Sequence, residues 1–269
     1  MVKSDNQTRP GLLVAERQRE ITESLNEHKS VRVSDLARLY QVTEETIRRD
    51  LERLENLGKL VRSHGGAIAI SQTASEKPFA ERTVANQNEK VRIAREAVQW
   101  IKPGDSILFD ASSTVWELAK ILPDMQLTVL TNAINVAVEL SDRPRIRVIC
   151  TGGNLSSPSM SFAGPMAEHF LRDYHVDRAF ISCSGIDVAN GLSDVNESQA
   201  ILKQTIINMA DQIVLLADHT KFGVKSLRLF APLESVTHLI TGSELVSDTA
   251  ESVRSTGVLL TIVGPMAVK

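Results

Sequence analysis

The sequence has few cysteines and no long apolar run, and each shortage excludes a class of protein. No apolar run approaches the length that spans a membrane, and the first residues, MVKSDNQTRPGLL, lack the apolar centre of an export signal. We therefore expect a cytoplasmic chain without a membrane partner. Only Cys150 and Cys183 are present, and in a cytosolic chain such a pair is more often two small buried residues than a disulfide. No cluster of metal-ligating residues stands out, so we expect neither a metal nor a cofactor.

An excess of charge of one sign is missing too. The formal net charge is −3 over 269 residues, and residues 1–70 carry 12 basic against 11 acidic side chains. Nonspecific attraction to DNA would therefore be modest, because that attraction grows with positive charge. If the chain binds DNA, recognition has to depend on local arginine placement and on two-fold symmetry, which implies a homodimer or a higher even oligomer.

Length and composition favour two domains of ordinary α/β character. A chain of 269 residues with 42% hydrophobic and 4% aromatic content fits about two domains. Residues 71–88, SQTASEKPFAERTVANQN, are polar and interrupted by Pro78, which is typical of a linker. We predict an N-terminal domain over 1–70 and a C-terminal domain over 89–269.

The N-terminal domain contains two short amphipathic helices joined by a short turn. Their apolar residues recur at helical spacing, as Leu36, Ala37 and Tyr40 in the first helix and Ile47, Leu51 and Leu54 in the second. Ser34 can cap the first helix and Thr43 the second. This succession predicts a helix-turn-helix, whose second helix enters the major groove of DNA.

The second helix presents two arginines on its outer half. With the apolar residues turned to the core, Arg49 points outward, and Thr46 and Arg48 lie on the flanks. Arginine binds guanine bidentately or holds a phosphate, and the sequence leaves open which arginine reads a base. An arginine pair on an amphipathic helix is also typical of a solvated face, so the DNA-binding hypothesis depends on the order of the elements. The predicted DNA-contacting residues are Thr43, Glu45, Thr46, Arg48, Arg49, Arg53, Arg62 and His64.

A hairpin follows the second helix. Gly58 is a suitable helix C-cap, and the apolar runs 59–63 and 67–70 flank His64-Gly65-Gly66. We expect this hairpin to be a wing, with Arg62 and His64 near the DNA backbone or minor groove.

The C-terminal domain alternates apolar runs with helical segments. The apolar runs cover 106–110, 127–131, 146–150, 178–183, 212–217, 236–240 and 258–263. Helical stretches cover 89–101, 113–122, 132–141, 197–210 and 244–256. This alternation, with near-continuous apolar strands, predicts an α/β domain with a largely parallel sheet covered by helices on both faces.

Polar residues gather at the carboxyl ends of these strands, where α/β sheets bind their ligands. Ser112, Ser113 and Thr114 open a helix directly after a strand, so their hydroxyls and free backbone N–H groups could hold a phosphate. Lys221 could neutralise its charge. Plain N-capping of the helix is the alternative.

Other residues at the strand ends have two interpretations. Gly152 and Gly153 would let the backbone approach a ligand, although a tight turn explains them nearly as well. The aspartates could accept hydrogen bonds from sugar hydroxyls or could cap loops. Asn196 and Glu197 begin a helix that either could cap, or they could face the pocket, and Lys203 could pair across that region. The predicted effector-binding residues are Asp110, Ser112, Ser113, Thr114, Thr131, Asn132, Gly152, Gly153, Gly185, Asp187, Asn196, Glu197, Asp218 and Lys221.

Two stretches resemble a known family of proteins. The stretch VSDLARLYQVTEETIRRDLERLENLGKLVRSHGGA, preceded by Arg17-x-x-x-Ile21-x-x-x-Leu25, resembles the winged helix-turn-helix of the DeoR family of bacterial sugar-metabolism regulators. It departs at His28-Lys29-Ser30, which lacks a glycine expected in the family. The segments DASST, TGG, SGID and DHTKFG are similar to the DeoR effector domain, in the fold group of ribose-5-phosphate isomerase and glucosamine-6-phosphate deaminase.

The resemblance implies a repressor of a carbohydrate operon whose affinity for double-stranded operator DNA is modulated by a phosphorylated sugar. The segments LFDASSTVWELAKILPD and FISCSGID look like the fucose or rhamnose type, which would favour a deoxyketose 1-phosphate. Two alternatives remain open: a transcriptional activator, and a sugar-phosphate isomerase or deaminase with a DNA-binding head. The isomerase relatives carry a Lys-Gly-Gly-Gly-Gly loop, whereas only Thr151-Gly152-Gly153-Asn154 occurs here. We therefore predict no enzymatic activity and no catalytic residue.

Overall fold

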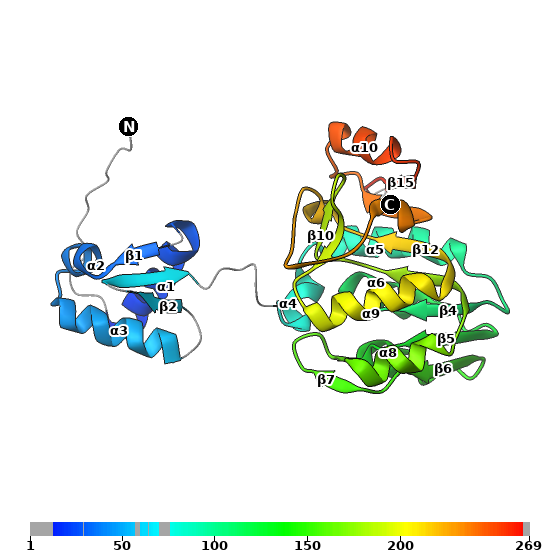
Figure 1. Cartoon of the computed structure of the whole chain (residues 1–269), viewed down its shortest axis with the longest axis horizontal. Helices are drawn as coiled ribbons and strands as arrows, with labels where there is room; N and C mark the ends of the chain where they lie inside the picture. Colours follow the sequence, from blue (N-terminus) through cyan, green and yellow to red (C-terminus); the bar gives the residue numbers. More distant parts are fainter. Residues whose placement is uncertain (1–12, 29, 57–59, 64, 70–75, 266–269) are drawn as a thin grey trace. The chain divides into compact units, whose positions relative to one another are not determined.

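The computed structural model describes residues 13–28, 30–56, 60–63, 65–69 and 76–265. The chain divides into two compact units, Met1–Ala74 and Ser75–Lys269. Figure 1 shows an N-terminal unit of three helices and a small sheet, and a C-terminal unit built on a large sheet. Each unit has a hydrophobic core of its own.

The N-terminal unit is a winged helix-turn-helix, as predicted. A three-stranded antiparallel sheet with the order β1-β3-β2 packs beside the helices. The elements are α1 (Val14–His28), β1 (Ser30–Arg32), α2 (Val33–Tyr40), α3 (Glu44–Asn56), β2 (Leu60–Ser63) and β3 (Gly66–Ala69).

Strand β1 was not predicted, and Gly66 makes its pairing possible. A Cβ atom at Gly66 would lie 2.1 Å from the carbonyl oxygen of Val31, so only glycine lets β1 and β3 approach this closely. The predicted hairpin is present as β2 and β3. Gly58 and His64 lie outside the described residues.

One of the two predicted helix caps is correct. The Thr43 hydroxyl accepts a hydrogen bond from the N–H of Thr46 at 3.2 Å, so Thr43 caps α3. The prediction for Ser34 is wrong, because α2 begins at Val33 and has no side-chain cap. The N–H of Val33 donates instead to the carbonyl of Gly65 at 2.9 Å, so the wing satisfies the backbone group at this helix end.

A buried ion pair fixes α1 on α3. The Arg17 guanidinium lies 2.6 Å from the Asp50 carboxylate, and both side chains are less than a tenth exposed. Gln18 donates a further hydrogen bond to Asp50. Around this pair the apolar positions form the core of the unit, as Ile21, Leu25, Val33, Leu36, Tyr40, Ile47, Leu51, Leu54, Leu60 and Ala67.

All seven apolar runs predicted for the C-terminal unit are strands of one parallel sheet. Its order is β15-β14-β12-β9-β4-β5-β6, and every neighbouring pair is parallel. The strands are β4 (Ser106–Phe109), β5 (Leu127–Thr131), β6 (Ile146–Cys150), β9 (Val176–Ile181), β12 (Ala210–Leu216), β14 (His238–Gly242) and β15 (Leu259–Val263).

Helices cover both faces of this sheet, as predicted. Successive strand residues point to opposite faces. Leu108 accordingly packs in one cluster, with α8, α9 and α10, and its neighbour Phe109 in the other, with α5, α6 and α7. The helices are α5 (Gln87–Ala97), α6 (Ser113–Ile121), α7 (Ile134–Leu140), α8 (Pro165–Arg172), α9 (Glu197–Asn208) and α10 (Ser247–Arg254).

Several short elements lie outside the predictions. A hairpin of β7 and β8 and a small sheet of the order β10-β11-β13 flank the main sheet. Helix α4 (Phe79–Val84) and the start of α5 occupy part of the segment expected to be a linker. The strands are β7 (Asn154–Ser156), β8 (Ser161–Ala163), β10 (Gly185–Asp187), β11 (Gly191–Asp194) and β13 (Arg228–Ala231).

The cysteines and the membrane prediction can be checked directly. Both cysteines are free; Cys183 is buried, but Cys150 is exposed, so the expectation of two buried residues is wrong for Cys150. Cys150 ends β6, which is an edge strand of the sheet and pairs with β5 on one side only. Among the described helices, none is both long and apolar enough to span a bilayer.

Candidate functional site

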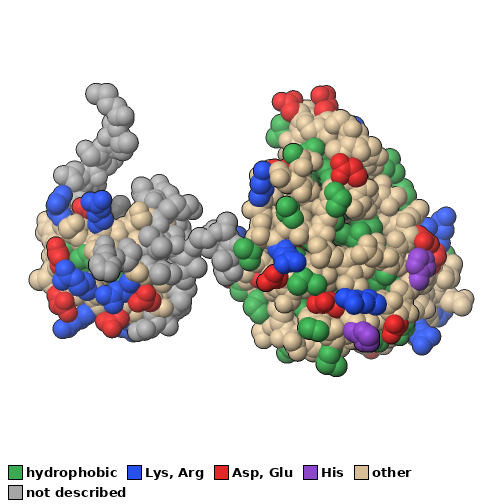
Figure 2. Space-filling model, in the orientation of Figure 1, with side chains coloured by type: hydrophobic (Ala, Val, Ile, Leu, Met, Phe, Trp, Pro, Cys, Tyr) green, Lys and Arg blue, Asp and Glu red, His purple; other side chains and the backbone are tan. Residues whose placement is uncertain are grey.

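Helix α3 carries Arg48 and Arg49 exposed and paired with acids of the same helix. The Arg48 guanidinium lies 2.6 Å from the Glu44 carboxylate and 3.8 Å from Glu45, and Arg49 lies 3.4 Å from Glu45. The face of the N-terminal unit in Figure 2 shows basic side chains beside acidic ones. Exposed pairs of this kind are worth at most about 1 kcal/mol, so a DNA phosphate or base edge can replace the glutamates.

The remaining predicted DNA contacts surround this helix. Thr43 and Thr46 share a hydrogen bond between their hydroxyls at 2.9 Å at the start of α3, and Arg53 is exposed near its end. Arg62 is exposed on β2, and its N–H donates to Glu55 of α3 at 2.9 Å, which ties the wing to the helix. His64 lies outside the described residues.

The C-terminal sheet has a topological switch point between β4 and β9. From β4 the chain proceeds outward through β5 and β6, and it then returns to β9 and proceeds the other way through β12, β14 and β15. In open α/β sheets ligands bind in the crevice outside the carboxyl ends of the strands at such a point. The segments that follow β4 and β9 are therefore the candidate effector site.

A buried charge network occupies the switch point. Asp110, directly after β4, accepts hydrogen bonds from the N–H groups of Ser112 and Ser182, both at 3.0 Å. The Lys203 ammonium lies 2.7 Å from the Asp194 carboxylate and 3.5 Å from that of Asp110. Asp110 thus joins the loops after both strands, which is the loop-capping role that we left open beside sugar binding.

Lys203 does pair across this region, as predicted, and the pair is strongly coupled. Burial alone would lower the pKa of Lys203, but the Asp194 and Asp110 carboxylates overcome that effect and raise it above its usual value. The Lys203 ammonium also donates to the carbonyl of Ser182 at 2.7 Å. The charged groups of the network therefore have their hydrogen-bond and ion-pair partners within the network.

The start of α6 offers unsatisfied donors beside this network. Ser112 caps the helix by accepting a hydrogen bond from the N–H of Val115 at 3.1 Å, so capping accounts for this residue. Within the described residues, the N–H and hydroxyl groups of Ser113 and Thr114 have no hydrogen-bond partner, although both residues are buried. The positive end of α6 thus presents free donors at the switch point.

Two lysines of the C-terminal unit interact electrostatically with each other and with Asp218. Lys90 of α5 is buried, and burial is the main cause that lowers its pKa to about 8, while the Asp218 carboxylate opposes the shift. Lys221, after β12, belongs to the same electrostatic neighbourhood, and no carboxylate of the described residues forms an ion pair with it. Lys221 therefore adds positive charge at the carboxyl edge of the sheet, beside the Asp218 carboxylate.

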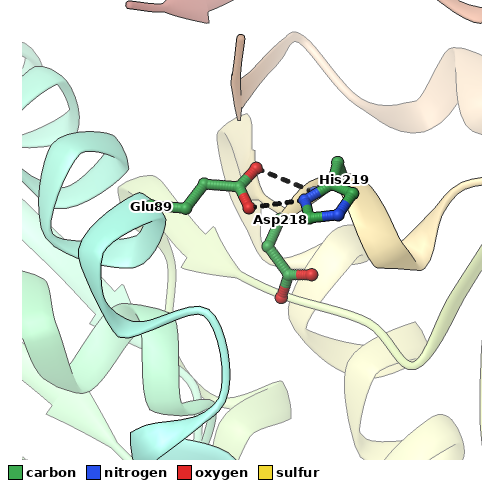
Figure 3. Close-up of side chains that lie close together, drawn as sticks. All are labelled: Glu89, Asp218 and His219. Atoms are coloured by element: carbon green, nitrogen blue, oxygen red, sulfur yellow. Dashed lines mark hydrogen bonds and ion pairs between the residues drawn. The ribbon is translucent and has the colours of Figure 1, made fainter. Parts of the chain in front are cut away.

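Glu89, Asp218 and His219 bring three potential metal ligands within 4.8 Å of one another. In Figure 3 the Glu89 carboxylate faces His219. The imidazole Nδ1 of His219 lies 2.7 Å from this carboxylate, and the backbone N–H of His219 donates a hydrogen bond to it at 2.9 Å. The Asp218 carboxylate points away from them and accepts hydrogen bonds from Asn86 and Thr220. We interpret these contacts as structural, because they hold the loop after β12 against α5.

The residues predicted after β5 and β6 have structural contacts. The Thr131 hydroxyl donates to the carbonyl of Phe109 at 2.8 Å. The Asn132 amide donates to the carbonyl of Phe162 at 3.0 Å, and its buried Oδ1 has no hydrogen-bond partner among the described residues. A Cβ at Gly153 would lie 2.9 Å from the carbonyl oxygen of Ala163, so Gly153 serves close packing, whereas Gly152 has open space around it.

The residues predicted after β9 are dispersed. A Cβ at Gly185 would lie 2.3 Å from the carbonyl oxygen of Val224, which explains that glycine by packing alone. Asp187 closes the β10–β11 turn by accepting hydrogen bonds from Asn190. Asn196 caps α9, and Glu197 is exposed and paired with Arg228. The structure does not bring Asp187 and Glu197 into the buried network.

Sequence reasoning missed Asp194, Glu89 and Lys90. Asp194 ends β11, a four-residue strand that has no apolar alternation, and the other two stand at the predicted domain boundary among polar residues. The sequence therefore offers no local signal for them beyond their charge. A separate cavity of about 480 Å³, lined by residues such as Tyr174, Gln204 and Thr205, contains none of the predicted site residues.

A winged helix-turn-helix joined to a parallel α/β domain with a polar switch point defines a class: DNA-binding transcriptional regulators with a sensor domain. The comparisons with known proteins agree. Residues 17–73 match the family described as DeoR-like helix-turn-helix domain, and residues 85–243 match the DeoR C terminal sensor domain. The chain belongs to the DeoR family of transcriptional regulators.

Several relatives match along most of their length. The HTH-type transcriptional regulator YulB of Bacillus subtilis is 53% identical over 87% of this chain and 91% of its own. The L-fucose operon activator of Escherichia coli is 37% identical over 87% and 97%, and the transcriptional repressor AccR of Agrobacterium fabrum is 36% identical over 85% and 89%. The family thus includes repressors and activators, and its members regulate transcription rather than catalyse reactions.

A solved structure of ribose 5-phosphate isomerase A from Methanocaldococcus jannaschii is also similar to part of the chain. The match covers 51% of this chain and 55% of the isomerase, with 17% identity and a TM-score of 0.39. At that level the likeness supports no conclusion about activity.

Proposed function

We propose that the chain represses a carbohydrate catabolic operon and that a phosphorylated sugar, bound at the carboxyl edge of the sheet, alters its affinity for operator DNA. The observation that carries this proposal is the buried start of α6. There the unpaired N–H groups of Ser113 and Thr114 stand at the switch point, in a region where Lys90 and Lys221 supply positive charge. A phosphate dianion satisfies both the donors and the cations.

On the DNA side, we propose that Arg48 and Arg49 exchange their glutamate partners for phosphate or guanine, while Arg62 and His64 of the wing approach the backbone or minor groove. The near-neutral charge of residues 1–70 supports reading by a homodimer or higher even oligomer on a two-fold symmetric site. We propose that the regulator acts in the cytoplasm, where bacterial DNA lies.

A thermal-shift panel tests the effector class. Sugar phosphates and the same sugars without phosphate are compared on the full chain, because a ligand of the native state raises the melting temperature with its occupancy. We expect a shift with one or more phosphorylated sugars and with none of the parent sugars. Equal shifts for a sugar and its phosphate would remove the anion site from the proposal.

Two lysines on the same loop provide a matched pair of variants. Lys221→Ala should abolish the thermal shift, because it removes a cation near α6. Lys225→Ala is the control, since Lys225 is exposed and lies 3.4 Å from Asp187 of the β10–β11 turn. A full response of the Lys221 variant would exclude this lysine from the site.

The relative named L-fucose operon activator supports two finer alternatives. One is activation rather than repression, which depends on where the DNA site lies relative to the promoter. The other is a deoxyketose 1-phosphate as the effector. A transcription assay on the chain's own promoter region, with and without such a ligand, separates activation from repression.

A further inference from the structure

We propose that the segment from Glu76 to Lys90 reads the occupancy of the effector site, because it holds two of the side chains that a polyhydroxylated sugar phosphate would need. This inference rests on the function proposed above and adds how the site is regulated. The segment includes α4, which is the first element of the C-terminal unit after its boundary at Ser75. It therefore stands where the chain enters from the DNA-binding unit.

The first held side chain is Asp218. The amide of Asn86 donates to Asp218 Oδ1 at 2.9 Å across 132 positions of sequence. Asn86 adopts a left-handed conformation with φ of 52°, which aims its side chain from the start of α5 toward the loop after β12. A sugar hydroxyl that donates to Asp218 takes the place of this amide.

The second held side chain is Asn196, the N-cap of α9. Its amide donates to the Glu76 carboxylate at 3.0 Å across 120 positions of sequence. Glu76 also lies 3.4 Å from the Arg82 guanidinium, whose Nε and Nη2 atoms are buried and have no hydrogen-bond partner among the described residues. A sugar hydroxyl oxygen that accepts from Asn196 takes the place of Glu76.

The third attachment leads to α6, whose first turn carries the free donors. The Phe79 ring packs edge-on against Trp116 of α6 at 5.5 Å between centroids. The N–H of Phe79 donates to the carbonyl of Pro158 at 2.7 Å, and the Lys90 ammonium donates to the carbonyl of Arg82. Helix α4 is thus fastened to the loops around the proposed site, and the contacts that a ligand contests are those of Glu76 and Asn86 on either side of it.

Ligand binding and the attachment of α4 are thermodynamically linked, because both use the same side chains. A ligand that displaces Asn86 and Glu76 weakens the attachment of α4, and removal of those attachments strengthens ligand binding by the same factor. Inorganic phosphate lacks the sugar hydroxyls that would contest Asp218 and Asn196. Inorganic phosphate should therefore bind without weakening the attachment of α4. The sugar part of the ligand would be what changes that attachment.

The test uses the full chain with Asn86→Gly and Glu76→Ala. Glycine accepts the left-handed conformation without strain, so Asn86→Gly removes the amide alone. The matched controls are Asn88→Ala in the same helix turn and Glu81→Ala on α4, whose side chains are exposed. The readouts are hydrogen exchange of residues 79–90 without ligand, the affinity for a duplex of the chain's own promoter region, and the affinities for D-fructose 1-phosphate and inorganic phosphate.

Both variants should exchange faster over 79–90 and change the ligand-free affinity for promoter DNA, while the controls behave as wild type. Each should bind D-fructose 1-phosphate about tenfold more tightly and inorganic phosphate unchanged, as loss of a competing hydrogen bond to a charged group implies. Unchanged exchange and DNA affinity without ligand would overturn the proposal. Failure of both phosphates to bind any variant would instead contradict the proposed effector class, and the ligand-free readouts would still decide this inference.

Discussion

The two units place their charged groups in opposite environments. On α3, Arg48 and Arg49 are exposed and pair with glutamates of their own helix turn. In the C-terminal unit Lys203 is buried between two aspartates from separate loops. Exposed pairs exchange partners at little cost, whereas a buried charge cannot lose its partner without a large penalty. The first arrangement suits contact with DNA, and the second holds the loops of the proposed effector site in place.

The N-terminal unit has one buried pair of its own, and breaking it should have the largest effect. Asp50→Ala removes the carboxylate that lies 2.6 Å from the buried Arg17 guanidinium, and breaking a buried pair costs about 3–5 kcal/mol. Loss of helical circular dichroism should then occur at lower temperature. Both tryptophans, Trp100 and Trp116, belong to the C-terminal unit, so their fluorescence transition should stay where it is.

The control for this variant is Glu52→Ala, an exposed residue of the same helix. It should change stability by less than about 0.5 kcal/mol. If Asp50→Ala and Glu52→Ala melt alike, burial does not distinguish the two kinds of pair.

An arginine from an exposed pair should matter for DNA binding and hardly for stability. Arg49→Ala should weaken binding to the chain's promoter region by about 1–3 kcal/mol, the value of a good base contact. Arg19→Ala is the matched control, because Arg19 pairs with Glu23 at the same i,i+4 spacing and its side chain is 76% exposed, against 78% for Arg49. Fluorescence anisotropy that gives equal losses for both variants would contradict the assignment of α3.

Burial should also make the C-terminal unit sensitive to acid. Burial lowers the pKa of His238, whose Nε2 lies 2.8 Å from the Thr261 hydroxyl. The folded state therefore binds fewer protons than the unfolded state, and stability falls as the pH drops through the ordinary histidine value of 6.5, by at most about 1.4 kcal/mol per pH unit.

His238→Gln should flatten this dependence between pH 7 and 5 in the tryptophan-detected transition. His175→Gln, at a residue whose side chain is 67% exposed, should leave the slope as in wild type. A slope that His238→Gln leaves unchanged would assign the acid sensitivity to other groups.

The smallest expected effect is on anion binding. The pKa of Lys90 is about 8, so the lysine loses its charge as the pH rises from 7 to 9. Sulfate, which does not titrate in this range, should bind more weakly at pH 9, by about 1 kcal/mol for one charge at moderate distance. Isothermal titration should show this loss for wild type and not for Lys90→Met. If Lys90→Met loses as much sulfate affinity as wild type between pH 7 and 9, Lys90 is not the source of this pH dependence.

The sequence predicted the main sheet well, because each of its strands is buried on both faces and therefore reads as a continuous apolar run. It failed where elements are short or their partners are distant. Strand β1 has three residues and depends on Gly66 to pair, and β10 and β11 were hidden by polar composition. Helix α4 lies in a polar segment, and Pro78 occupies its N-cap position instead of interrupting structure.

The candidate site was predictable in place and less so in detail. Strand ends could be located from the apolar runs, so Asp110, Ser113 and Asp218 were found where the structure has them. The partners of these residues were not found, because Asn86 and Glu76 act across more than a hundred positions. Local sequence carries no record of such contacts, and only the topology of the sheet brings them together.

One titration tests the central claim most directly. The full chain is titrated onto a duplex of its own promoter region, with and without the sugar phosphate that gives the largest thermal shift, and with Lys221→Ala beside wild type. We expect the ligand to change the dissociation constant of wild type by about 5- to 150-fold and to leave that of the variant unchanged. A wild-type dissociation constant that is the same with and without bound ligand would contradict the account.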